Sequence, residues 1–142
     1  MKELHLNQSQ MKVWAKDFAQ RLKSNTLILL EGDLGAGKTF LVQSIVKELS
    51  QSEITCSPTY ALHNTYLTTD FKVEHFDLYR LENFADLEAA GFFEALSEED
   101  NVVFVEWANR LPEKALPFNR SIYRIHLEID GDARRLQIQE VV

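Results

Sequence analysis

The chain has 142 residues, of which 45% are apolar and 26% are charged, and this composition predicts a single globular domain over residues 1–142. Its net charge of −7 argues against a protein that binds nucleic acid alone, because a basic surface supplies most of that affinity. No apolar run approaches the roughly 20 residues that cross a bilayer, and the single cysteine, Cys56, excludes an internal disulfide, so we expect a cytoplasmic protein without membrane contact.

The N-terminal segment predicts a short strand followed by a helix. Residues 2–6 alternate and are typical of an edge strand. Asn7 then has the character of a helix cap, with Gln10 three residues later. Apolar residues recur at helical spacing over residues 8–23, and Trp14 lies on this apolar face. We interpret Trp14 as a core residue, and contact with an adenine ring is the alternative.

The most informative stretch of the sequence is a glycine-rich turn between an apolar strand and a helix. Residues 26–31 are nearly all apolar, as in a parallel strand buried on both faces. Residues 32–39 fit the pattern G-x-x-x-x-G-K-[ST], and an amphipathic helix is predicted over residues 40–49. This order of strand, loop and helix is what a phosphate-binding loop requires.

The residue types of this loop explain why it predicts phosphate binding. Glycines without a Cβ let the backbone curl with its N–H groups inward, and the following helix turns its positive end toward the phosphates. Lys38 supplies a charge for the outer phosphates, and Thr39 supplies a hydroxyl for Mg²⁺. The predicted nucleotide-binding residues here are Gly32, Asp33, Leu34, Gly35, Ala36, Gly37, Lys38 and Thr39.

Two further segments carry polar groups that could meet a nucleotide. In the Ser57-Pro58-Thr59 segment, Thr59 is a candidate sensor of the third phosphate, and an ordinary Ser-Pro turn is the alternative. Residues 61–66 and 71–77 predict two strands joined by a short connection, hence an antiparallel pair. Asp77 ends the second strand, either as a carboxylate near the metal or attacking water, or as an ion-pair partner of Arg80.

The next part of the chain predicts a helix over residues 81–96, a solvated acidic loop over residues 97–100, and a buried strand over residues 102–107. Glu106 follows four apolar residues, which is the pattern of the strand beside a phosphate loop whose acid reaches Mg²⁺. A helix-capping role for Glu106 is the alternative. Trp107 either shields the site or packs against a partner.

The C-terminal part predicts a β-hairpin. Residues 121–129 and 134–142 alternate between apolar and polar, and the segment Asp130-Gly131-Asp132 marks the turn between them. The elements together predict an α/β fold of the P-loop nucleoside triphosphate hydrolase class. We expect three layers, with a mostly parallel central sheet and additional antiparallel hairpin strands.

Four motifs, in order and with their spacing, resemble the bacterial tRNA threonylcarbamoyladenosine biosynthesis ATPases of the TsaE (formerly YjeE) family. The resemblance covers residues 26–110, and the remainder of the chain matches only in pattern. Phe40 and Ala108 depart from the family, in which threonine and proline are common at these positions. The motifs are Gly32–Thr39, Ser57–Tyr60, His75-Phe76-Asp77-Leu78-Tyr79-Arg80 and Val105-Glu106-Trp107.

The resemblance implies a function that the residues alone do not give. Members hydrolyse ATP with Mg²⁺ in support of a TsaD–TsaB complex, which forms threonylcarbamoyladenosine at position 37 of tRNAs that read codons beginning with A. Contact with tRNA is then only indirect. The implied catalytic residues are Lys38, Asp77 and Glu106, with Thr39 and Glu106 at the metal and Thr59 and Trp107 at the nucleotide.

Several points stay open at the level of sequence. Either Asp77 or Glu106 positions the attacking water, Arg80 is the candidate for an arginine finger, and adenine contacts are expected from residues 8–11 or Arg134. The rival functions are a small-molecule kinase, for which an arginine-rich lid is missing, and a nucleotide-gated binding module without catalysis. ATP is preferred over GTP because the guanine-reading N-K-x-D motif is absent.

Overall fold

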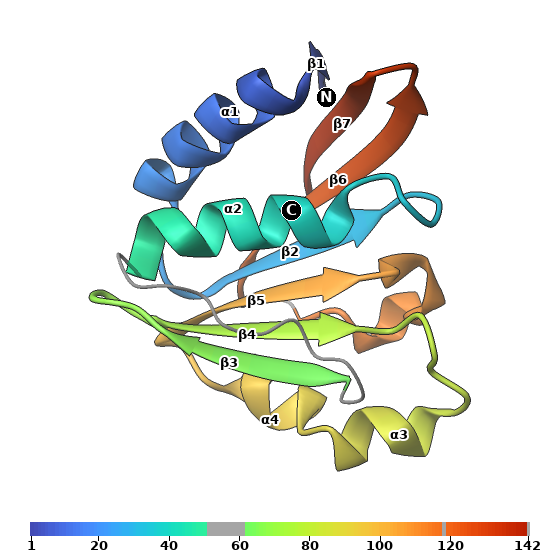
Figure 1. Ribbon diagram of the computed structural model, residues 1–142. Coiled ribbons are helices and arrows are strands. Elements are labelled where there is room, and N and C mark those ends of the chain that lie inside the picture. Colours follow the sequence, from blue (N-terminus) through green and yellow to red (C-terminus); the bar gives the residue numbers. More distant parts are fainter. Residues whose placement is uncertain (51–61, 118, 142) are drawn as a thin grey trace.

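The computed structural model describes residues 1–50, 62–117 and 119–141, and places them in a seven-stranded sheet with helices on both faces (Figure 1). The strands follow the order β1-β7-β6-β2-β5-β4-β3. The elements are β1 Lys2–Leu6, α1 Gln8–Arg21, β2 Thr26–Glu31, α2 Lys38–Ser50, β3 His63–Leu67, β4 Lys72–Asp77, α3 Phe84–Ala89, α4 Phe92–Ser97, β5 Asn101–Glu106, β6 Ser121–Asp130 and β7 Ala133–Val141, with short 3₁₀ helices at Ala108–Arg110 and Glu113–Ala115.

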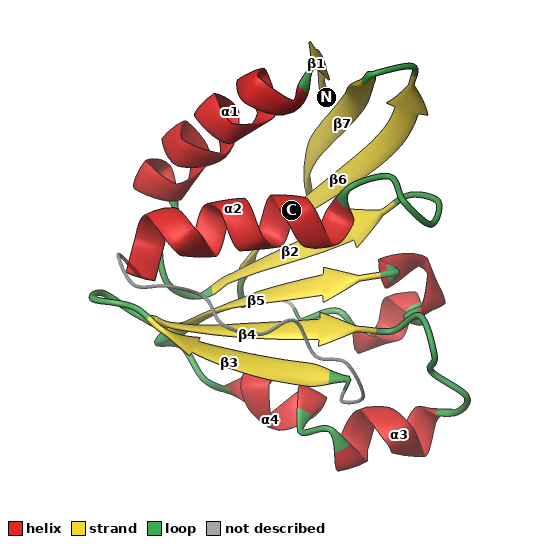
Figure 2. Cartoon of the chain, viewed as in Figure 1, coloured by secondary structure: helices red, strands yellow, loops and turns green. Residues whose placement is uncertain are grey.

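The centre of the sheet is parallel and its two edges are antiparallel, as Figure 2 shows. The strand β2 pairs in parallel with β6 on one side and β5 on the other, and β5 pairs in parallel with β4. The remaining pairs, β1 with β7, β7 with β6, and β3 with β4, are antiparallel. The predicted α/β architecture with hairpin additions is therefore confirmed.

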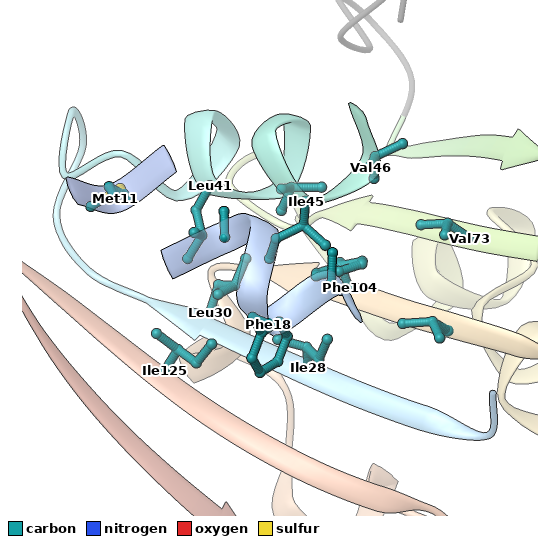
Figure 3. Close-up of a cluster of buried hydrophobic side chains, with 14 of the residues drawn as sticks. Met11, Phe18, Ile28, Leu30, Leu41, Ile45, Val46, Val73, Phe104 and Ile125 are labelled. Carbon is teal, nitrogen blue, oxygen red and sulfur yellow. The ribbon is translucent and has the colours of Figure 1, made fainter. Parts of the chain in front are cut away.

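The apolar run of β2 is continuous because both faces of this strand are covered. Ile28 and Leu30 lie in the core formed with α1 and α2, whereas Leu27 and Leu29 lie in the core formed with α3 and α4. Figure 3 shows Phe18 of α1 and Ile45 of α2 directed toward the sheet. Alternate side chains of one strand thus join two separate cores, which fixes the strand in register.

The N-terminal helix begins as its sequence predicts. The Asn7 side chain accepts a hydrogen bond from the backbone N–H of Gln10, and Gln10 Oε1 accepts one from the backbone N–H of Asn7, both at 2.8 Å. Trp14 stacks on Phe18 with ring centres 5.0 Å apart, which agrees with a packing role for this indole. The helix ends at Arg21, two residues before its predicted end.

The predicted single helix over residues 81–96 is wrong, because two short helices occupy this segment. Asn83 and Asp86 form a capping box that starts α3, and α4 begins after Gly91. Gly91 has φ of +80°, a left-handed conformation that interrupts the helix and that glycine adopts at low cost. The acidic residues 98–100 that follow are exposed, as expected for a solvated loop.

The structure places no helix long and apolar enough to traverse a bilayer among the residues that it describes.

Candidate functional site

The site lies where three parallel strands end side by side. In the register of the sheet, Glu106 of β5 is opposite both Leu30 of β2 and Asp77 of β4. The phosphate loop leaves β2 at this edge, so the two acids and the loop meet there, as ligand sites do at the carboxyl ends of parallel strands. They share a cavity of about 230 Å³, which is lined by Leu34, Gly35, Gly37, Lys38, Thr39, Phe40, Asp77, Tyr79, Glu106 and Trp107.

The loop has a conformation that its glycines alone tolerate well. At Gly32, φ is +149°, and an added Cβ would lie 2.5 Å from the backbone oxygen of Leu127. The turn closes with a hydrogen bond of 3.0 Å from the Ala36 N–H to the Asp33 oxygen. From β7, Arg134 Nε donates to the Ala36 oxygen at 3.0 Å. The loop therefore lies close against β6 at Gly32 and is bonded to β7 through Arg134.

Lys38, which begins α2, is folded back onto the loop. Its Nζ donates to the backbone oxygens of Gly32 at 2.5 Å and Asp33 at 2.9 Å. The same ammonium lies 4.1 Å from the centre of the Trp107 ring, a cation–π contact. Burial lowers the pKa of the Lys38 ammonium, and the carboxylates of Glu106, Asp77 and Asp33 oppose that shift. A triphosphate would replace weak carbonyl partners with charged ones.

Trp107 has an unusual backbone that follows directly from β5. Its φ of 59° is left-handed, a conformation that costs a bulky residue about 1–3 kcal/mol. In this position the indole contacts Lys38 and lies 5.0 Å from the Tyr79 ring. Both rings line the cavity together with residues of the phosphate loop.

A chain of hydrogen bonds crosses the site through Glu106, whose side chain is buried. Thr39 Oγ1 donates to Glu106 Oε1 at 2.7 Å, and His75 Nε2 lies 2.5 Å from Glu106 Oε2. Sequence reasoning did not single out His75 as functional. The available signal was its spacing, because His75 and Asp77 are two residues apart on a strand and so share a face of the sheet.

Asp77 lies half-buried beside Glu106 in the same cavity. Its Oδ1 accepts a hydrogen bond of 3.0 Å from the Tyr79 N–H. Burial raises the pKa of the Asp77 carboxyl, Glu106 raises it further, and the Tyr79 amide, His75 and Lys38 oppose the shift. Arg80 is exposed, and an Asp77–Arg80 pair is not among the ion pairs of the described residues.

The oxygens of Thr39 and Glu106 suit a hard cation such as Mg²⁺. Protein sites for Mg²⁺ commonly supply one or two oxygen ligands and leave the others to phosphates and water. In the described part of the chain, no group of three or more His, Cys, Asp or Glu side chains could hold a metal by itself. The two oxygens, held 2.7 Å apart, thus fit a cation that arrives with a phosphate and not an all-protein metal centre.

A second cavity, of about 330 Å³, adjoins the phosphate loop. Gln8, Met11 and Arg134, which include the expected adenine contacts, line it together with Gly35, Gly37, Phe40 and Asp132. A larger cavity, of about 430 Å³, lies near the start of β2 and contains Trp14 and Tyr123. None of the motif residues that the structure describes lines this larger space.

The structure brings together most of the predicted site residues. Asp33 and Leu34 are exposed on the loop, whereas Gly32 is half-buried and Ala36 is buried. Thr59, predicted to contact the nucleotide, lies outside the described residues, as does Cys56. One cavity is lined by Leu34 and by the remaining predicted residues, which are Gly35, Gly37, Lys38, Thr39, Asp77, Glu106 and Trp107.

Comparison with known proteins places the chain in a family. The crystal structure of YdiB from Bacillus subtilis has a TM-score of 0.73 at 27% identity, covering 99% of this chain and 87% of that one. The tRNA threonylcarbamoyladenosine biosynthesis protein TsaE of Rickettsia felis is 37% identical over 131 residues, 92% of this chain and 74% of that protein. The protein of the same name from a Nostoc species is 42% identical over 97 residues, 67% of this chain and 60% of that protein.

The fold agrees with that of the solved relative. The architecture is that of P-loop nucleoside triphosphate hydrolases, with the loop between β2 and α2. A family model described as "Threonylcarbamoyl adenosine biosynthesis protein TsaE" matches residues 6–137. Because that match extends over nearly the whole sequence, the chain belongs to the TsaE family.

Proposed function

We propose that this chain is a Mg²⁺-dependent ATPase that supports the formation of threonylcarbamoyladenosine in tRNA. The observation that carries the proposal is the single cavity shared by Lys38 and Thr39 of the loop with the carboxylates of Asp77 and Glu106. Membership of the TsaE family supports the tRNA pathway, since the relatives are named for threonylcarbamoyladenosine biosynthesis.

The proposed roles follow from the chemistry of each group. The loop N–H groups and Lys38 stabilise the charge that develops on the transferring phosphoryl group. When bound, Mg²⁺ neutralises charge on the phosphate oxygens, and Thr39 and Glu106 would hold it. Asp77, whose pKa burial raises, can accept a hydrogen bond from the attacking water.

The cavity beside the loop is the proposed adenosine site. It adjoins the phosphate loop through Gly35 and Gly37, so one ligand can extend from it into the phosphate site. Met11 offers an apolar contact to a base and Gln8 offers an amide. Arg134 is already bonded to the loop oxygen of Ala36, and its planar side chain borders the same space.

We further propose that turnover by the isolated chain is slow and that a TsaD–TsaB type complex stimulates it. Among the described residues that line the phosphate cavity, none is an arginine, and Arg80 is exposed. An arginine finger is worth about 10³–10⁵ in rate in related nucleotidases. A partner that supplies a cation, or that moves Arg80 inward, would complete the site.

The test is phosphate release by the purified protein with and without TsaD, TsaB and tRNA. We expect stimulation of the wild type by the partners, and loss of phosphate release in Lys38→Ala and Glu106→Ala. Equal rates with and without partners would overturn the coupling. Phosphate transfer to a small molecule in place of water would indicate a kinase, and ATP-dependent partner binding that survives Asp77→Ala with an unchanged cycle rate would indicate a binding module.

A further inference from the structure

Among the described residues, the side chain of the buried histidine of β4 has one hydrogen-bond partner, Glu106. The His75 ring is 1% exposed, and its Nε2 lies 2.5 Å from Glu106 Oε2. Its Nδ1 is buried without a hydrogen-bond partner in the described part of the chain. Because a carboxylate only accepts, the ring must donate its Nε2 hydrogen to Glu106. In the described part of the chain the imidazole therefore bonds to Glu106 alone, and its unpaired Nδ1 lowers the stability of the fold.

The opposite oxygen of the same carboxylate points to the phosphate loop. Glu106 Oε1 accepts from Thr39 Oγ1 at 2.7 Å, so donors on two different elements hold the two oxygens. Without the His75 bond, the carboxylate would keep one described side-chain donor, Thr39, to set its orientation. The contact joins two neighbouring parallel strands of the sheet, which are rigid supports for a site.

Packing fixes the ring as well as its hydrogen bond. The Tyr66 ring of β3 stacks beside His75, with centres 6.3 Å apart and planes 28° apart. A side chain whose role was only to fill this space would be apolar, because a buried unpaired nitrogen lowers stability. The polar atom is explained by its effect on Glu106.

We propose that His75 is a positioning residue that holds the Glu106 carboxylate in the orientation that receives Mg²⁺ beside Thr39. The inference rests on the proposed function, because it assigns to Glu106 the metal-linked role stated there. Removal of a hydrogen-bonding group behind a metal ligand typically weakens metal affinity by about 10–100-fold. We expect the same weakening of Mg²⁺ affinity when the His75 bond is removed, while the phosphate loop keeps its affinity for the nucleotide.

Two isosteric variants separate the positioning role from packing. In His75→Gln the amide nitrogen takes the place of Nε2 and can still donate to Glu106. In His75→Asn it takes the place of Nδ1 and falls short. A control is His63→Asn, which breaks another His–Glu contact, that with Glu74 in the β3–β4 pair, away from the cavity.

The measurement is the dissociation constant of a fluorescent ADP analogue, first in EDTA and then during a Mg²⁺ titration. We expect His75→Asn to raise the Mg²⁺ concentration for half-maximal tightening by about 10–100-fold, with unchanged affinity in EDTA. His75→Gln and His63→Asn should stay within about threefold of the wild type. An unchanged Mg²⁺ midpoint in folded His75→Asn overturns the positioning role. A wild type without Mg²⁺ dependence overturns the proposed function instead.

A second measurement uses the unaltered protein and does not depend on a variant that folds. Long-range ¹H–¹⁵N spectra report which ring nitrogen of each histidine carries hydrogen. We expect His75 to carry its hydrogen on Nε2 and to keep it when Mg²⁺ and ADP are added. Hydrogen on Nδ1 alone would contradict the bond to Glu106 and with it the proposal.

Discussion

Lys38 and Trp107 are in direct contact, with the ammonium 4.1 Å from the centre of the indole ring while it donates to the loop oxygens of Gly32 and Asp33. A nucleotide must therefore compete with the loop's own carbonyl groups for this cation. Charge-assisted bonds to phosphate are stronger than bonds to neutral carbonyls, so the exchange favours the ligand.

This contact predicts a fluorescence signal on nucleotide binding. In a Trp14→Phe background, Trp107 is the remaining indole of the two in the chain, and its emission should change when Mg²⁺ and ATP draw Lys38 off the ring. Lys38→Met should abolish the change and weaken ATP affinity more than about 10-fold, because a charged hydrogen bond is worth roughly 1.5–3 kcal/mol. Calorimetry would establish that the protein is saturated with nucleotide. Trp107 emission that stays constant at saturation would contradict the movement of Lys38 from the ring to the phosphates.

The half-buried carboxyl of Asp77 should make the folded protein less stable at neutral pH than at acid pH, as far as this group contributes. Its pKa is raised in the folded state, chiefly by burial, so its ionised form opposes folding. The opposing contribution is present at neutral pH and disappears as pH falls through the folded pKa toward the ordinary value of 3.8. Asp77→Asn should therefore raise the melting temperature of the nucleotide-free protein at pH 7, and the gain should vanish near pH 3.

The control for this experiment is Asp70→Asn in the exposed turn between β3 and β4, which removes the same formal charge from a solvated position. Melting curves from pH 3 to pH 8 would compare both variants with the wild type. A gain at Asp77 that is constant over this range, or equal to that at Asp70, would show that burial of the carboxyl is not its source.

We expect Gly32→Ala to lower the free energy of unfolding more than other glycine-to-alanine substitutions in the loop. An alanine Cβ would lie 2.5 Å from the Leu127 backbone oxygen, in addition to the strain of a φ of +149°. Strain and overpacking together should cost about 3 kcal/mol or more. Gly131→Ala has a positive φ but no atom within 4 Å, so it should cost only about 1–2 kcal/mol. Urea unfolding checks the order, and a smaller loss at Gly32 would show that the loop relaxes.

Much of this arrangement could be predicted from the sequence, because the signals are local. The strand, loop and helix around Lys38 are contiguous in the chain, and the acid of β5 directly follows its apolar run. The turn around Gly131 likewise predicts the hairpin formed by β6 and β7. Each of these predictions needed only a short window of residues.

The features that sequence reasoning missed depend on contacts between distant segments. His75 reads as one polar residue in a strand, and its role arises only when β4 pairs with β5, 31 residues later. Gly91 interrupts a helix whose apolar spacing continues on both sides, so periodicity gave no sign of the break. The position of the Lys38 ammonium, folded back onto the loop, depends on its contact with the distant Trp107. The helix α2 begins at Lys38, two residues before its predicted start.

Arg120 predicts a stability effect that is separate from the nucleotide site. Its buried guanidinium donates to the Thr26 oxygen at 3.2 Å and also to Asn101 Oδ1 and the Glu98 oxygen, joining β2, β5 and the end of α4. Burial lowers the pKa of this group, with Glu98 and Glu99 opposing. Arg120→Met strands several acceptors and should cost about 3 kcal/mol or more.

For Arg120→Met, denaturant unfolding should show a loss of stability, whereas a nucleotide titration should show almost unchanged ATP affinity. The free energy of unfolding falls, whereas ATP affinity of the folded fraction stays within about twofold of the wild type, because Arg120 lines neither of the two cavities beside the loop. Arg110→Met, at an exposed position, is the control and should change neither. A parallel loss of ATP affinity would show that the two ends of the sheet are coupled.

The place of β5 next to β2 has a consequence for biosynthesis. Thr39 and Glu106 touch in the finished molecule but are 67 positions apart in the chain. While the protein is being translated, the glycine-rich turn leaves the ribosome long before its carboxylate neighbours exist. A nascent polypeptide that stops before β5 therefore carries the glycine-rich turn and Asp77 without Glu106, so under the proposed function the ability to engage magnesium is completed late in synthesis.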